Sequence, residues 1–76
     1  MYPEKLIEEK CYELNPQLKE AGLLVIAIPD PIRVGHTIAI FKNTTEPAIK
    51  EFFLDHIVAE ACFENHDCSG WKRLFE

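Results

Sequence analysis

The spacing of apolar residues along the chain predicts one long helix near its carboxyl-terminal end. Over 47–64, large apolar side chains recur at helical spacing, and Phe52 and Phe53 lie in the middle of the wider apolar stripe. We therefore expect both phenylalanines to be well buried, and truncation of either to alanine to cost about 3–5 kcal/mol of stability. We expect the rest of the chain to pack around this helix.

The same predicted helix has a second apolar side, which polar strips separate from the first. A helix that is apolar on two sides is normally buried on both, so this side should meet another helix, a second copy of the chain or a foreign partner. The amino-terminal helix offers only one apolar face, which must also cover strands, so we favour a twofold homodimer. The second side consists of Leu54, Ile57, Val58 and Ala61.

Ahead of the long helix, the pattern predicts an amphipathic helix, a short helical turn and two strands. The turn begins at Asn15-Pro16 and ends before Gly22. The continuous apolar run 23–28 predicts a central strand, and the alternation over 33–42 predicts a second strand. A proline-rich segment separates the two, which favours an antiparallel hairpin. The apolar face of the first helix carries Leu6, Ile7, Cys11 and Leu14.

Beyond the long helix, the composition of 65–70 indicates a loop, and the aromatics of 71–75 favour a short strand that returns to the sheet, with a docked tail as the alternative. The chain of 76 residues is expected to be a single domain, 1–76. Its fold class is α+β, with a small antiparallel two- or three-stranded sheet. An amino-terminal helix and a long carboxyl-terminal helix pack on one face, in the order α-(α)-β-β-α-(β).

Composition and charge limit the possible partners. The formal net charge is -5, and no cluster of lysine or arginine is present, so direct nucleic-acid binding is not expected. The first residues are charged and polar, and no apolar run approaches the ~20 residues of a membrane helix. We therefore expect a cytoplasmic protein without membrane contact. A hydrophobic content of 47% is generous for a lone monomer of this size, which again favours self-association.

The carboxyl-terminal cysteines are the residues closest to a recognisable chemistry. An odd number of cysteines without a secretory pattern predicts reduced thiols, so Cys62 and Cys68 should not be bonded to each other. In a helix that continued through His66, Cys62 and His66 would lie one turn apart, with Cys68 in reach. That set could hold a metal or form a Cys-His nucleophile. A tight Cys-x2-Cys hook is missing and so small a domain has little room for a catalytic pocket, so we expect no metal, no cofactor and no enzyme activity.

These observations favour a protein-interaction module. We expect a small acidic regulator or inhibitor, similar in size to many phage- and plasmid-encoded modulators, that covers a basic patch on a partner protein. The alternative is a small metal- or thiol-bearing module that uses Cys62, His66 and Cys68. Aromatic and long side chains of the tail add typical interface anchors. The expected partner-binding residues are Leu54, Ile57, Val58, Ala61, Trp71, Arg73 and Phe75.

Overall fold

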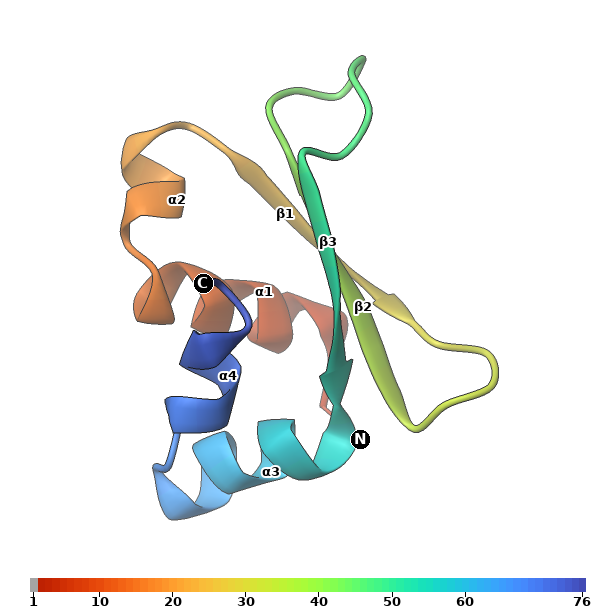
Figure 1. Ribbon diagram of the computed structural model, residues 1–76, viewed down its shortest axis with the longest axis vertical. Coiled ribbons are helices and arrows are strands. Elements are labelled where there is room, and N and C mark those ends of the chain that lie inside the picture. The colour runs from red at the N-terminus through yellow and green to blue at the C-terminus, as the bar shows by residue number, and fades with distance from the viewer. Residues whose placement is uncertain (1) are drawn as a thin grey trace.

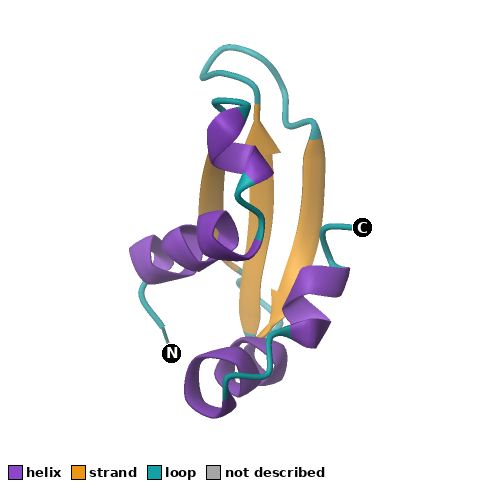
Figure 2. Ribbon diagram, turned by 90° about the vertical axis from the view of Figure 1, so that its left-hand side faces the viewer, coloured by secondary structure: helices purple, strands orange, loops and turns teal. Residues whose placement is uncertain are grey.

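The computed structural model describes residues 2–76, which form a three-stranded antiparallel sheet and four helices. In chain order the elements are α1 (Glu4–Leu14), α2 (Gln17–Glu20), β1 (Leu24–Pro29), β2 (Gly35–Phe41), β3 (Lys50–Asp55), α3 (His56–Asn65) and α4 (Ser69–Arg73). The strand order is β1-β2-β3, so each strand pairs with its neighbour in sequence. All four helices lie on one side of the sheet (Figures 1 and 2). The predicted α+β fold class is confirmed.

The hydrophobic core lies between the helices and one face of the sheet. Successive residues of a strand point to opposite faces, so alternate residues of each strand reach the helices. On this covered face the strands contribute Val25, Ala27, Ile38, Ile40 and Leu54. The helices contribute Ile7, Cys11, Leu18, Ala59, Cys62 and Trp71. The short and long helices thus share one layer of buried side chains.

The predicted helix over 47–64 is wrong in its first half. Residues Lys50–Asp55 form strand β3, which pairs with β2 from Gly35↔Asp55 to Ile40↔Lys50. The helix begins only at His56, where the Asp55 carboxylate accepts a hydrogen bond from the Ile57 N–H at 2.7 Å and caps it. A short apolar run fits both periods, and here the pairing with β2 decides in favour of a strand.

Phe52 and Phe53 lie on opposite faces of the sheet because they are neighbours in a strand. Both are half-buried, so the expectation that both are well buried is wrong. Phe52 faces the helix side and packs edge-to-face on Phe75, with ring centroids 5.3 Å apart. Phe53 faces away from the helices, and the Arg33 guanidinium lies 3.9 Å above its ring centroid. The Phe52 ring therefore lies on the covered side of the sheet, and the Phe53 ring lies on the side away from the helices.

The carboxyl-terminal segment is a short helix rather than the expected strand over 71–75. Helix α4 begins at Ser69 and lies against α3 on the helix side of the sheet (Figure 1). Its Trp71 is fully buried and packs edge-to-face on Phe63, with ring centroids 5.4 Å apart. A strand would have aligned alternate side chains with the sheet, whereas this helical turn directs the indole into the core.

Candidate interaction surface

No helix of residues 2–76 lies against the other face of the sheet (Figure 1), and exposed apolar side chains gather on it. Ile26 and Ile28 are 42% and 47% exposed, although isoleucine is among the residue types most often buried. When only one face of an antiparallel sheet is covered, the other is usually polar. An apolar patch in that position typically marks an interaction site. We call it the open face, and it consists of Leu24, Ile26, Ile28, Phe41 and Phe53.

The loop between β1 and β2 contacts the open face through Arg33, which lies over the ring of Phe53. Asp30 accepts hydrogen bonds from the Arg33 N–H at 2.7 Å and the Ile32 N–H at 2.9 Å. These backbone bonds, followed by the bonds and charge of the Arg33 side chain, lower the pKa of Asp30. The Arg33 Nη2 lies 2.9 Å from Asp30 Oδ2, and its guanidinium covers Phe53 as a cation–π contact. The charge of Arg33 is thus paired within the loop.

Gly35 lets Phe53 approach the backbone of β2 closely. Its φ of +154° is a conformation that other residues rarely adopt. A Cβ atom at this position would overlap the carbonyl oxygen of Leu54 and lie 2.7 Å from Phe53 Cζ. No other residue fits here without displacing the edge of the open face.

The outer edge of β1 is one of two edges of the sheet. The Asp30 N–H donates to the Gly35 carbonyl at 3.1 Å, so this hydrogen bond shows which residue pairs of the β1–β2 ladder are hydrogen-bonded. Hydrogen-bonded pairs alternate in an antiparallel ladder, so the main-chain groups of residues 25, 27 and 29 point away from β2. These N–H and C=O groups would have no hydrogen-bond partner in the sheet unless another part of the chain supplied one.

Helix α1 closes this edge with two side chains. The Tyr12 hydroxyl accepts from the Val25 N–H at 3.1 Å and donates to the Leu23 carbonyl at 2.9 Å. The Glu8 carboxylate accepts from the Ala27 N–H at 2.9 Å. The third outward position is Pro29, and proline has no N–H to donate. No outward donor of β1 remains available to another strand.

The outer edge of β3 is left open. The His56 N–H donates to the Val34 carbonyl at 3.0 Å, so the same alternation directs the main-chain groups of Glu51 and Phe53 away from β2. Within residues 2–76, no loop or side chain forms a hydrogen bond with these groups. We call them the free edge. Proteins usually protect such an edge, as α1 does for β1.

The carboxylates beside the free edge have no ion-pair partner in the described chain. Glu51 and Asp55 are both exposed, and the ion pairs of residues 2–76 involve other acids. Both side chains project to the same face as Phe53, because they lie two residues from it in the strand. Along the free edge, the side chains on this face are therefore Glu51, Phe53 and Asp55, in that order.

The structure places two of the predicted partner-binding residues in the core. Leu54 and Trp71 are 1% and 0% exposed, so they offer a partner no surface. Leu54 is buried because its strand directs it toward the helices, and Trp71 because α4 packs against α3. Phe75 is half-buried against Phe52, and only part of its ring is accessible.

The remaining predicted residues lie together at the surface of α3 and α4. Ile57 is 75% exposed, while Val58 and Ala61 are half-buried beside it. These three residues and Arg73 line a shallow hollow between the two helices. The structure thus brings four of the seven predicted residues together, and their contact with a partner stays a prediction. The open face and the free edge were absent from that prediction.

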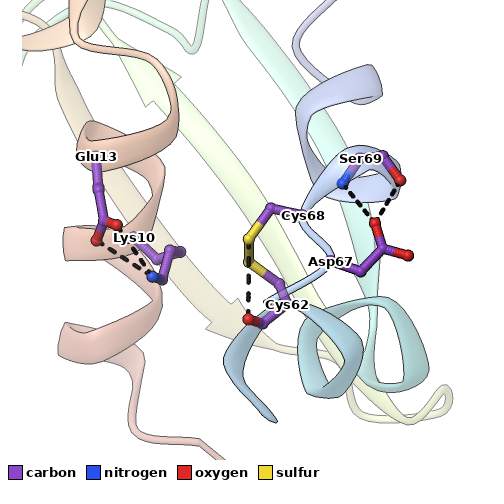
Figure 3. Close-up of a disulfide and its surroundings, with 6 residues drawn as sticks. All are labelled: Lys10, Glu13, Cys62, Asp67, Cys68 and Ser69. Carbon is purple, nitrogen blue, oxygen red and sulfur yellow. Dashed lines mark hydrogen bonds and ion pairs between the residues drawn. A yellow bond between two sulfur atoms is a disulfide. The ribbon is translucent and has the colours of Figure 1, made fainter. Parts of the chain in front are cut away.

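Cys62 and Cys68 form a disulfide, so the prediction of reduced thiols is wrong (Figure 3). The chain reverses after α3, where His66 has a left-handed conformation with φ 59°, and the two Cα atoms come within 4.3 Å. The prediction was based on the compartment expected for the chain and not on geometry, so it did not include this reversal. Because the sulfurs are bonded to each other, neither is a thiolate that could bind a metal or attack a substrate.

The loop within the disulfide ring is braced by Asp67, which accepts from the Ser69 hydroxyl at 2.7 Å and the Ser69 N–H at 3.3 Å (Figure 3). These hydrogen bonds lower the pKa of the Asp67 carboxyl. The third cysteine, Cys11, is free and fully buried. Burial raises the pKa of its thiol to about 12, although the neighbouring Trp71 side chain acts in the opposite direction. Cys11 is therefore a packed, protonated thiol at neutral pH.

A cleft of about 580 Å³ lies beside α1 and α2. Its lining includes Glu9, Glu13, Lys19 and the ring of Tyr12, whose hydroxyl is already bonded to β1. No group of three or more histidine, cysteine or acidic side chains in residues 2–76 is placed to hold a metal ion. The cleft shows no nucleophile with a base beside it, and we assign it no chemistry.

Comparisons of the chain with protein-family models, with curated proteins and with solved structures found no match. Among the described residues, no helix has the length and apolar character required to cross a membrane.

Proposed function

We propose that this chain is a small acidic protein-interaction module, which acts as a regulator or inhibitor by binding a partner protein over its open face. The observation that carries the proposal is the uncovered apolar side of the sheet. Ile26 and Ile28 remain 42% and 47% exposed there. A partner that covered them would remove apolar surface from water, which is the main driving force of protein association.

The acidic charge determines which partners are favoured. With a net charge of -5, the chain attracts a protein that has a basic patch, because complementary charge speeds encounter and disfavours acidic competitors. Helix α1 carries Glu4, Glu8, Glu9 and Glu13 together with Lys5 and Lys10, and Glu51 and Asp55 add negative charge at β3. Cytoplasmic location belongs to this proposal as well, and the Cys62–Cys68 disulfide counts against it, because cytosolic proteins rarely keep disulfides.

Self-association through α3 is a separate part of the proposal. Ile57, Val58 and Ala61 would meet the same patch of a second copy, and Val58→Glu would place a charge in that contact. We expect the variant to be a folded monomer by light scattering and circular dichroism. If the unmodified chain is already monomeric at all practical concentrations, the homodimer is excluded and the acidic module acts as a monomer.

The open face is tested by partner capture from an extract of the native host. Ile26→Thr combined with Ile28→Thr removes apolar surface and keeps residues that favour strands. Ile57→Thr is the matched control, because that isoleucine is also exposed but belongs to α3, which lies on the helix side of the sheet (Figure 1). The melting temperature of each variant establishes that it is folded.

We expect the double variant to retain less than a tenth of the partner that the unmodified chain captures, while Ile57→Thr retains most of it. A protein captured equally by all three would contradict binding at the open face. Loss of capture with Ile57→Thr alone would instead place the interface on α3.

A further inference from the structure

We propose that the free edge of β3 accepts an extended segment of the partner protein as a fourth strand of the sheet. The segment carries a basic residue, an apolar residue two positions later and a second basic residue two positions after that. This inference rests on the proposed function, to which it adds the local structure and the sequence pattern of the partner.

The two outer edges of the sheet differ in whether their main-chain donors are already bonded. On β1, the Tyr12 hydroxyl, the Glu8 carboxylate and the ring of Pro29 leave no outward donor for another strand. On β3, the main-chain groups of Glu51 and Phe53 point outward and have no partner among residues 2–76. A strand that pairs with such an edge gains a ladder of main-chain hydrogen bonds, which is the basis of peptide recognition by strand addition.

A row of acidic and aromatic side chains follows the free edge. Glu51, Phe53 and Asp55 project to the same face, and neither carboxylate has an ion-pair partner in the described chain. Side chains directly opposite on neighbouring strands lie about 4.5–5.5 Å apart at Cβ, where opposite charges and apolar pairs are favourable. The edge therefore fits a segment with the order basic, apolar, basic at every second position. This order reads the same in both directions, so it suits a parallel or an antiparallel strand.

The free edge is continuous with the open face. Across the sheet, Ile28 pairs with Thr37 and Thr37 with Phe53, so these side chains form one row. An apolar residue opposite Phe53 would extend that row by one position. The added strand would thus bury apolar surface of the open face and form the main-chain ladder together.

A second copy of the chain is a poorer occupant of this edge. Antiparallel pairing of two β3 strands about Phe53 would place Glu51 of each copy opposite Asp55 of the other. Like charges directly opposite are destabilising, and each copy carries a net charge of -5. Two carboxylates without an ion-pair partner among residues 2–76 favour a basic segment of a different protein.

The test uses an acetylated, amidated peptide of sequence Thr-Lys-Thr-Ile-Thr-Lys-Thr added to the full chain. A second peptide of the same composition, Thr-Lys-Lys-Thr-Ile-Thr-Thr, breaks the alternation and keeps the charge. We expect the first peptide to bind at least tenfold more tightly. Hydrogen exchange of the Glu51 and Phe53 amides should slow on binding, while the Val25 and Ala27 amides, already bonded to α1, should not change.

Variants of the chain separate strand addition from simple charge attraction. Glu51→Gln with Asp55→Asn removes both charges but keeps a capping side chain at the start of α3. It should lose the preference for the patterned peptide. Glu9→Gln with Glu13→Gln removes two charges from α1 and should keep that preference.

Equal binding of the two peptides, or binding without protection of the Glu51 and Phe53 amides, would overturn the inference. Protection of these amides that increases with protein concentration and without peptide would also overturn it, because the occupant would then be a second copy. These outcomes are distinct from failure of the proposed function, which depends on the capture experiment with Ile26 and Ile28.

Discussion

The two faces of the sheet are similar in apolar character and differ in what lies against them. On the covered face Ile38 and Leu54 are inaccessible, whereas on the open face Ile26 and Ile28 remain nearly half exposed. All four helices of the described chain lie on one side, so residue type alone does not determine burial (Figure 2). The covered face should therefore carry the stability of the fold, while the open face is available for binding. Substitutions on the two faces should have different effects on stability.

The largest expected difference is between Ile38→Ala and Ile26→Ala. Ile38 is fully buried, and its truncation should lower the free energy of unfolding by about 3–4 kcal/mol, because a cavity forms in the core. Ile26→Ala should cost only about 1 kcal/mol, since its side chain already contacts water. Urea unfolding of both variants gives the comparison. Equal losses would mean that the open face is covered in the free protein.

A sharper version of the comparison uses two adjacent rings. Phe52→Ala removes a half-buried ring that packs against Phe75 on the covered face, and we expect a loss of about 2–3 kcal/mol. Phe53→Ala removes a ring from the open face and should cost about 1 kcal/mol, part of it from the contact with Arg33. Thermal unfolding of both variants measures the difference, and a reversed order would contradict the assignment of the two faces.

Gly35→Ala tests the close approach of Phe53 and the Leu54 carbonyl to the backbone of β2. The new Cβ would overlap the Leu54 carbonyl and crowd Phe53 in a conformation with φ +154°, so we expect a loss of about 2 kcal/mol. Gly22→Ala is the control, because Gly22 has φ +69° but no atom within 4 Å of the added Cβ. Its cost should be about 1 kcal/mol, from the backbone conformation alone. Similar values for the two variants would show that Phe53 moves aside freely.

The smallest effect concerns Cys11, a titratable group beneath the covered face. Its thiol keeps its proton in the folded state, with a pKa raised to about 12 by burial. The raised pKa contributes stability that is fully present below the ordinary pKa of a thiol. This contribution is lost as the pH rises toward the pKa of the thiol in the folded state. Between pH 8 and pH 10 the unmodified chain should lose about 1 kcal/mol more than Cys11→Ala does. Equal pH dependence of the two proteins would mean that water reaches the thiol.

Much of the fold could be predicted from periodicity. The first helix, the short second helix and the hairpin of β1 and β2 lie where the pattern indicated. The third strand was missed because the run from Phe52 to Leu54 fits both a helical and a strand period. Only the presence of an unpaired edge on β2 decides between them, and an isolated pattern does not contain that information.

The candidate site was harder to predict because it depends on a sheet face that no helix of the described chain covers and on a strand edge that no other described segment pairs with. The run 23–28 predicted a central strand, which is wrong, because β1 is an edge strand of the sheet and only one of its faces is covered. The closing of β1 by Glu8 and Tyr12 joins residues that lie 19 and 13 positions from their partners, so no local pattern reveals it. The order Glu51, Phe53, Asp55 was visible, but its significance appears only once β3 is recognised as an edge strand.

Trp71, the single tryptophan of the chain, gives the protein an intrinsic optical probe. The indole is inaccessible to water and packs against Phe63 in the core, so its fluorescence should be blue-shifted in the native state. Because α4 is tied to α3 by the disulfide, reduction of Cys62–Cys68 followed by release of α4 would expose the indole and shift its emission to the red. A change confined to the open face, such as Ile26→Thr, should leave the emission unaltered. One spectrum therefore reports whether a substitution has disturbed the core.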